Sequence, residues 1–98
     1  MMRGTTPTIT FTLPIPTAAI DSGYVTFAQS GSVKIDKSLS DCERKDNKVS
    51  VTLSQSETLS LSADITTEIQ LALRCGSKVF RSKIMRVQTD RILKDGEI

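Results

Sequence analysis

This chain of 98 residues contains no histidine, only two cysteines and only four aromatic residues. Without histidine neither a Ser-His nor a Cys-His pair can form, and the commonest general base of enzymes is missing. No stretch approaches the roughly 18 consecutive apolar residues that span a bilayer. We therefore expect no enzyme, no cofactor and no membrane partner.

The two cysteines, Cys42 and Cys75, have 32 residues between them. This spacing matches no zinc motif, and a structural zinc needs four ligands. The segment Met1–Gly4 and the threonines after it lack the apolar core of a signal peptide, so we expect the chain to stay in the cytoplasm where it is made. Reduced thiols are then the expectation, with a disulfide as the alternative if the two strand ends are adjacent.

Charged groups give little further indication of chemistry. The formal net charge of +2 is too small to imply a partner. Asp41 and Glu43 fall near a predicted turn, where carboxylates are usually solvated. We therefore assign no catalytic residue and no metal ligand.

The sequence does contain a two-residue alternation of apolar and polar side chains in three segments. The apolar members are Ile9, Phe11 and Leu13 in Thr8–Leu13, then Val49, Val51 and Leu53 in Lys48–Leu53, then Ile65, Ile69, Leu71 and Leu73 in Ile65–Arg74, where Thr67 fills the register. A period of two sends successive side chains to opposite faces, which predicts strands with one buried face. Thr10, Ser50 and Gln70 should then lie on the polar faces.

Turn and cap signals separate these strands. The prolines of Pro14–Pro16 end the first strand, and Thr17 is the predicted N-cap of a short helical turn over Thr17–Ser22. Ser30–Gly31 predicts a tight hairpin between strands at Tyr24–Gln29 and Ser32–Lys37. Ser54 and Glu57 have the spacing of a capping box, which predicts a helical turn over Gln55–Leu59.

A long hairpin is predicted from Ile65–Arg74 and Lys78–Val87, closed by Cys75–Ser77. In the second arm the alternation slips, because Met85 and Phe80 fall in opposite registers. Either both faces are covered there or a bulge switches the face. The segment Arg91–Ile98 is expected to be a final short strand or a tail.

These elements favour one all-β domain over residues 1–98. We predict an antiparallel β-sandwich, Ig-like or jelly-roll-like, with six to seven strands and one or two short helical turns. The segment Met1–Thr6 is predicted to be a flexible arm.

Two interaction sites can be suggested from the residues. The first is an edge formed by Thr6, Thr8, Thr10 and Thr12, which could pair with a neighbouring chain by strand addition. Alternatively, the prolines at 7, 14 and 16 simply blunt that edge. The second site is a basic stretch with no acid in it, made of Arg74, Lys78, Arg81, Lys83 and Arg86.

This basic stretch offers a nucleic-acid contact, but its pattern is weak. On a continuous strand Arg81 and Lys83 share one face, whereas Arg74, Lys78 and Arg86 share the other, so the charges are split. Phe80 is the only aromatic ring nearby for base stacking. A solvated or subunit-facing strand is the simpler interpretation, so we do not expect nucleic acid as a partner.

Several segments resemble a small family of uncharacterised proteins. The matching segments are Met2–Thr8, Thr10–Pro14, Tyr24–Gln29, Asp41–Cys42, Leu53–Leu59, Ile69–Leu71 with Arg74, and Arg91–Gly96. The family is encoded in phage and prophage structural-gene regions of Gram-positive bacteria. More distantly, the layout is similar to N-terminal β-sandwich domains of phage baseplate and tail-fibre proteins. The basic segment Arg81–Arg86 departs from the pattern, which is usually more apolar there.

The resemblance implies a non-enzymatic, virion-associated structural or assembly protein, with no catalytic residues to carry over. Its partners would be other phage structural proteins or copies of itself, in a weak homo-oligomer. The chain would be cytoplasmic when made and would then join the virion. A nucleic-acid-binding accessory protein that uses the basic stretch is the alternative.

Overall fold

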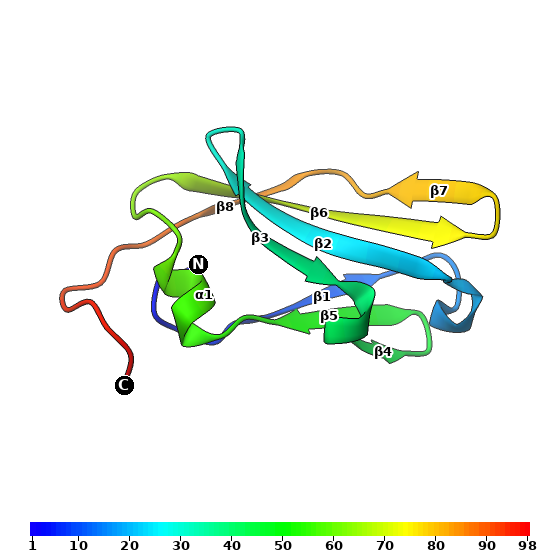
Figure 1. Ribbon diagram of the computed structural model, residues 1–98, viewed down its shortest axis with the longest axis horizontal. Helices are drawn as coiled ribbons and strands as arrows, with labels where there is room; N and C mark the ends of the chain where they lie inside the picture. The colour runs from blue at the N-terminus through cyan, green and yellow to red at the C-terminus, as the bar shows by residue number, and fades with distance from the viewer.

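Two antiparallel sheets lie face to face, one above the other in Figure 1. The structure, a computed structural model, describes all 98 residues. The small sheet has the order β1 (Thr8–Thr12), β5 (Lys48–Thr52), β4 (Glu43–Lys45). The large sheet has the order β3 (Ser32–Ser38), β2 (Ser22–Gln29), β6 (Thr66–Cys75), β7 (Lys78–Arg81), and β8 (Met85–Gln88) also pairs with β6. The predicted all-β sandwich is confirmed, but it has eight strands where six to seven were expected, because Lys78–Val87 divides into β7 and β8.

The helical elements are short. One α-helix, α1, spans Gln55–Leu59, and two 3-10 turns span Thr17–Ala19 (η1) and Leu39–Asp41 (η2). The predicted capping box is present, because the Glu57 N–H donates to Ser54 Oγ at 3.2 Å and the Ser54 N–H donates to Glu57 Oε1 at 2.8 Å. None of these helices has the length and apolar character that crossing a bilayer requires.

Thr17 is not the N-cap that the sequence suggested. Pro16 takes that position before η1, without a side-chain cap. The Thr17 hydroxyl instead donates to the carbonyl of Asp46 at 2.9 Å. The hydroxyl therefore joins η1 to the β4–β5 turn and does not satisfy the helical backbone.

The core lies between the sheets and follows the alternation. Its members from the strands and the residues just after them are Phe11, Leu13, Val25, Phe27, Ile35, Val49, Val51, Leu53, Ile69, Leu71 and Leu73, and the connecting segments add Ile20, Leu39 and Leu61. Ile9 is only half-buried, but it packs against this cluster. Thr10 is exposed, and Ser50 and Gln70 face away from the core with partial exposure. The predicted register is therefore confirmed, except that Ile65 precedes β6 and is 37% exposed.

One end of the core is polar. Gln29 and Thr67 hold core-facing positions, and both are almost fully buried together with Thr89. The Gln29 side chain donates to the carbonyl of Ser62 at 2.9 Å and accepts from the Ser62 N–H at 2.8 Å, while Thr67 and Thr89 share a hydroxyl hydrogen bond. This network fixes the segment after α1 and the segment after β8 against the large sheet, because each buried polar group needs its partner.

Met1–Thr6, expected to be a flexible arm, is bound to the body of the molecule. Met2 forms a parallel bridge with Asp90, and the Arg3 N–H donates to the Asp90 carbonyl at 3.2 Å. The Arg3 guanidinium donates to the carbonyls of Leu61 and Leu59, at 2.7 and 2.9 Å, and to Asp95 at 2.8 Å. The segment is thus a clasp between α1 and the C-terminal tail. Sequence reasoning missed it because its partners lie more than fifty residues away.

Candidate functional site

Strand β1 leaves one of its edges without a neighbouring strand. It lies at the end of the small sheet and pairs only with β5. The Leu53 N–H donates to the Pro7 carbonyl at 3.0 Å, and the Leu13 N–H donates to the Asn47 carbonyl at 2.7 Å. The backbone groups of Pro7 and Leu13 therefore point toward the β5 side. In an antiparallel ladder hydrogen-bonded pairs alternate, so the N–H and C=O groups of Thr8, Thr10 and Thr12 point away from β5. These three backbones form the free edge.

The threonine side chains themselves lie on the outer face of the small sheet. The Thr8 hydroxyl is 2.8 Å from that of Thr52, and the Thr10 hydroxyl is 2.9 Å from that of Ser50. These cross-strand pairs hold β1 against β5. Any recognition at this edge would therefore use the threonine backbones more than the hydroxyls. Thr6, which was grouped with them, is exposed but precedes the strand.

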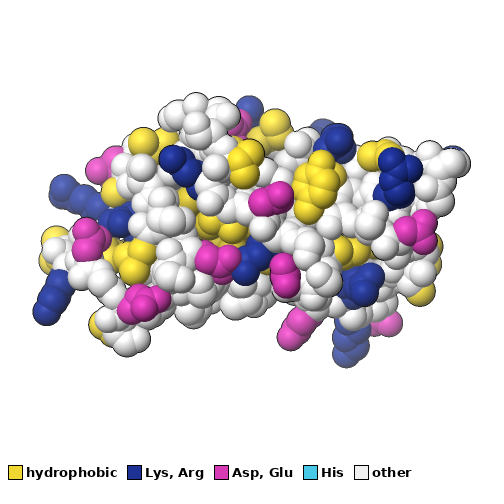
Figure 2. Space-filling view, in the orientation of Figure 1, with side chains coloured by type: hydrophobic (Ala, Val, Ile, Leu, Met, Phe, Trp, Pro, Cys, Tyr) yellow, Lys and Arg dark blue, Asp and Glu magenta, His cyan; other side chains and the backbone are white.

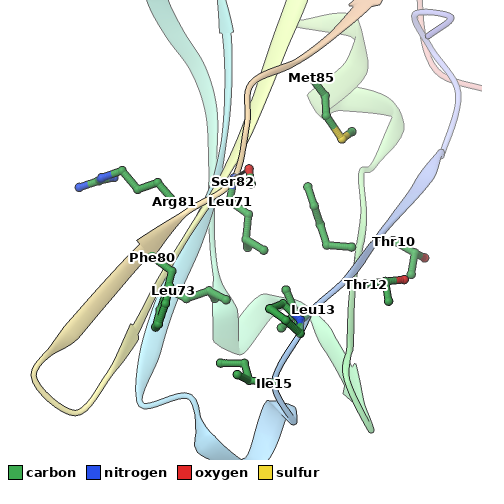
Figure 3. A pocket seen from close by; sticks show the side chains of 12 residues that line it. Thr10, Thr12, Leu13, Ile15, Leu71, Leu73, Phe80, Arg81, Ser82 and Met85 are labelled. Carbon is green, nitrogen blue, oxygen red and sulfur yellow. Dashed lines mark hydrogen bonds between the residues drawn. The ribbon is translucent and has the colours of Figure 1, made fainter.

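An apolar groove runs beside this free edge, between β1 and the β7–β8 edge of the large sheet (Figure 3). Its volume is about 400 Å³. Phe11 of β1 and Leu13 and Ile15 just after it line the groove on one side, Leu71 and Leu73 line it from β6, and Phe80 and Met85 from the outer edge of the large sheet. Phe80 is 47% exposed and Met85 is 38% exposed, although both face the inside of the sandwich. We call the β1 edge and this groove together the open side.

A break in the predicted second hairpin arm places Phe80 and Met85 on the same side. Lys78–Val87 is two strands, because Ser82–Ile84 leaves the ladder. Phe80 is opposite Leu73, and Met85 is opposite Ile69, so both project toward the core side. The three-residue interruption resets the register and thereby explains the slip in the alternation.

Ser82 replaces the missing strand pairing at this break. Its N–H donates to the Leu71 carbonyl at 2.8 Å, and its hydroxyl oxygen accepts from the Leu71 N–H at 2.9 Å. The Ser82 carbonyl accepts from the Gln70 amide at 2.9 Å. Ser82 thus supplies hydrogen-bond partners for the Leu71 backbone and the Gln70 side chain where the strand pairing is interrupted.

The basic residues are distributed differently from the continuous-strand expectation. Because of the β6–β7 turn and the Ser82–Ile84 break, Arg74, Arg81 and Arg86 all face outward from the large sheet. Lys78 takes the opposite face, and Lys83 lies in the break. The predicted split of Arg81 from Arg74 and Arg86 is therefore wrong.

Two of these arginines already have partners. Arg86 forms an ion pair with Glu68 at 3.2 Å, and Arg81 donates to the Tyr24 hydroxyl at 3.1 Å. On the face shown in Figure 2, acidic and basic side chains are interspersed and form no continuous basic stripe.

The thiols are both free and half-buried. Burial raises the pKa of the Cys42 thiol, Asp41 raises it further, and the positive charges of Lys37 and Arg44 only partly offset this rise. Cys42 is therefore a poor nucleophile at neutral pH, because the thiolate is the reactive form. No group of three or more histidine, cysteine or acidic side chains lies close enough together to hold a metal ion.

Comparison with known proteins finds no match: no family model, no curated protein and no solved structure is significantly similar to this chain.

Proposed function

We propose that this chain is a non-enzymatic structural or assembly protein of a phage or prophage particle, in the tail or baseplate, acting through protein–protein contacts. The open side carries the proposal. It combines an unpaired strand edge with an apolar groove whose rim exposes Phe80 and Met85. Soluble proteins usually protect such edges, and exposed apolar patches usually mark interaction sites.

The family resemblance supplies the phage setting. The segments that carry it, such as Thr10–Pro14 and Leu53–Leu59, include one flank of the open side and the capping box of α1. In this proposal the chain is made in the cytoplasm and then joins the particle. Its partners are other virion proteins or further copies of itself.

The test is the composition of purified particles. Particles from the host strain should contain peptides of this chain by mass spectrometry, and deleting its gene should lower the infectious titre or alter the tail in electron micrographs. A matched pair of variants, Thr10→Pro and Thr10→Ala, should separate the edge from the side chain, with only the proline variant defective. A chain absent from particles and assembly intermediates, whose deletion changes neither titre nor morphology, would contradict the proposal.

One observation favours nucleic-acid binding as the second candidate. Arg74, Arg81 and Arg86 share the outer face of the large sheet, next to the partly exposed Tyr24. Against it, Glu68 neutralises Arg86, and Arg81 is engaged by Tyr24. A mobility-shift titration at physiological salt decides between the two. Binding that is lost in Arg74→Ala with Arg81→Ala, and that weakens steeply with salt, would favour the second candidate.

A further inference from the structure

We infer that the open side binds the open side of a second copy of this chain, with β1 strands paired antiparallel about a two-fold axis at Thr10. This inference rests on the proposed function for its setting and names the partner there. It follows from two features of the open side, namely the absence of charged residues from β1 and the self-complementary register of that strand; the small area of the open side sets the strength of the pairing.

The edge has none of the usual protection against pairing. No charged residue occurs from Gly4 to Ile20, and proteins commonly place lysine or inward-pointing charges on exposed edges. Pro7, Pro14 and Pro16 lie outside β1, so they limit the free edge to five residues without interrupting it. Arg81 is one of the residues that line the groove, but its side chain points away from the groove in Figure 3.

The sequence of β1 is complementary to itself when reversed. In the register that sets Thr10 opposite Thr10 of the second copy, Thr8 is opposite Thr12 and Ile9 is opposite Phe11. All outward N–H and C=O groups of the three threonines then find partners, since each hydrogen-bonded pair exchanges two bonds. Sliding by two residues leaves one threonine of each copy unpaired, and sliding by one sets outward groups against inward ones.

Side chains on both faces fit this register. Threonine meets threonine on the outer face, and Ile9 meets Phe11 on the inner face, and both are favourable cross-strand pairs. The inner face of the second copy's β1 would also approach the groove, where Phe80 and Met85 are exposed. Pairing would therefore remove apolar surface from water as well as completing the ladder.

The area sets the strength. The exposed half of the Phe80 side chain could bury roughly 100 Å² of apolar surface. A five-residue strand adds little apolar surface of its own. Such an interface falls short of the roughly 1,200 Å² of a stable complex. We expect the isolated dimer to have a dissociation constant in the micromolar to millimolar range. Repeated copies in a particle would strengthen the association by multivalency.

Disulfide trapping tests the register. In the full chain carrying Cys42→Ser and Cys75→Ser, Thr10→Cys should oxidise to a linked dimer, because residue 10 faces its own counterpart at about 5.5 Å between Cα atoms. Ser50→Cys is the matched control, since it lies on the same outer face but in the middle strand. A mixture of Thr8→Cys and Thr12→Cys chains should give the mixed dimer in preference to either self-dimer. Equal linkage at positions 10 and 50 would overturn the register.

Sedimentation across a concentration series tests the pairing itself. The natural chain and Thr10→Ala should associate reversibly, whereas Thr10→Pro should stay monomeric, because proline removes an outward N–H that β5 does not use. A chain that is monomeric at millimolar concentration overturns the inference. Saturable binding of another virion protein's strand to a monomeric chain, abolished by Thr10→Pro, overturns it in favour of that partner. If the monomer nevertheless occurs in purified particles, only this inference fails; a dimer absent from particles overturns the proposed function instead.

Discussion

Gly23 lets two strands of the large sheet approach closely. It pairs with Leu73 in the β2–β6 ladder. A Cβ atom at this position would lie 2.5 Å from the Ala72 carbonyl oxygen and 2.8 Å from Leu73 Cδ2. The closer of these atoms belongs to the backbone of β6, so that contact cannot be relieved by a side-chain rotation. The position therefore requires glycine for space, and no positive φ is involved.

Replacing Gly23 by alanine should lower the free energy of unfolding by about 1–3 kcal/mol, the usual cost of overpacking. Urea denaturation followed by circular dichroism measures this loss. Ser22→Ala, at the exposed neighbouring position, should change stability by less than about 0.5 kcal/mol. An unchanged stability of the Gly23 variant would mean that β2 and β6 can separate locally without cost.

At the scale of the element, α1 depends on one carboxylate. Glu57 closes the capping box and also contacts Lys37 of β3 at 2.6 Å. Burial raises the pKa of Glu57, but hydrogen bonds from Lys37 and from Ser54, together with the Lys37 charge, lower it by more. The pKa of the folded form therefore lies below its usual value.

A lowered carboxyl pKa has a defined effect on stability. The stabilisation by Glu57 is fully present above the pKa of the unfolded chain, about 4.3, and is lost as the pH falls through the lower pKa of the folded form. Urea unfolding between pH 7 and pH 3 should show this loss. In Glu57→Gln the same pH range should produce a smaller change, because the titrating group is gone; an identical pH dependence would contradict the assignment.

The β7–β8 break depends on Ser82. Ser82→Ala leaves the Leu71 N–H without its acceptor and should lower the free energy of unfolding by about 1–3 kcal/mol. Ser82→Thr retains the oxygen and serves as the control. Amide hydrogen exchange at Leu71 should accelerate in the alanine variant only. Uniform acceleration along β6 in both variants would indicate that the break tolerates no substitution and that the hydroxyl has no special role.

For the whole molecule, the clasp formed by Met1–Thr6 joins the N-terminus to the sandwich, and Arg3 supplies three of its side-chain hydrogen bonds. The Arg3 side chain is 17% exposed and donates to the carbonyls of Leu59 and Leu61. Carbonyls at the end of a helix lack N–H donors within the helix, so Arg3 supplies them. The molecule measures 45 × 27 × 16 Å, and α1 and both termini lie at one end of the long axis (Figure 1). The clasp therefore holds together α1 and the two chain ends at this end of the sandwich.

Arg3→Ala should lower the free energy of unfolding by about 1.5–3 kcal/mol, since its hydrogen bonds involve a charged donor. Arg3→Lys should recover only part of this, because an ammonium group lacks the fork that reaches two carbonyls at once. Thermal unfolding of the three proteins gives the comparison. Deleting Met1–Thr6 would disturb this clasp together with any association, so point variants at Thr10 are the better test of pairing. Equal stability of all three proteins would show that the clasp opens freely.

Local sequence is enough to specify the strands with one buried face, the hairpin at Ser30–Gly31 and the capping box at Ser54 and Glu57. Each of these is specified by residues within a few positions of one another, through side-chain period, permitted φ angles or a local hydrogen bond. The register also placed Thr67 on the buried face, but the burial of Gln29 and the hydrogen-bond partners of both residues were not predicted.

Long-range contacts are needed to specify the division of Lys78–Val87, the shared face of Arg74, Arg81 and Arg86, and the binding of Met1–Thr6 to the body. They also determine which edge of β1 stays free and that Phe80 and Met85 lie beside it. These features depend on which distant strand supplies each backbone partner. An alternating segment has the same sequence pattern at the centre of a sheet and at its edge. The period of two determines the face on which each side chain lies, but it does not determine which strands lie beside it.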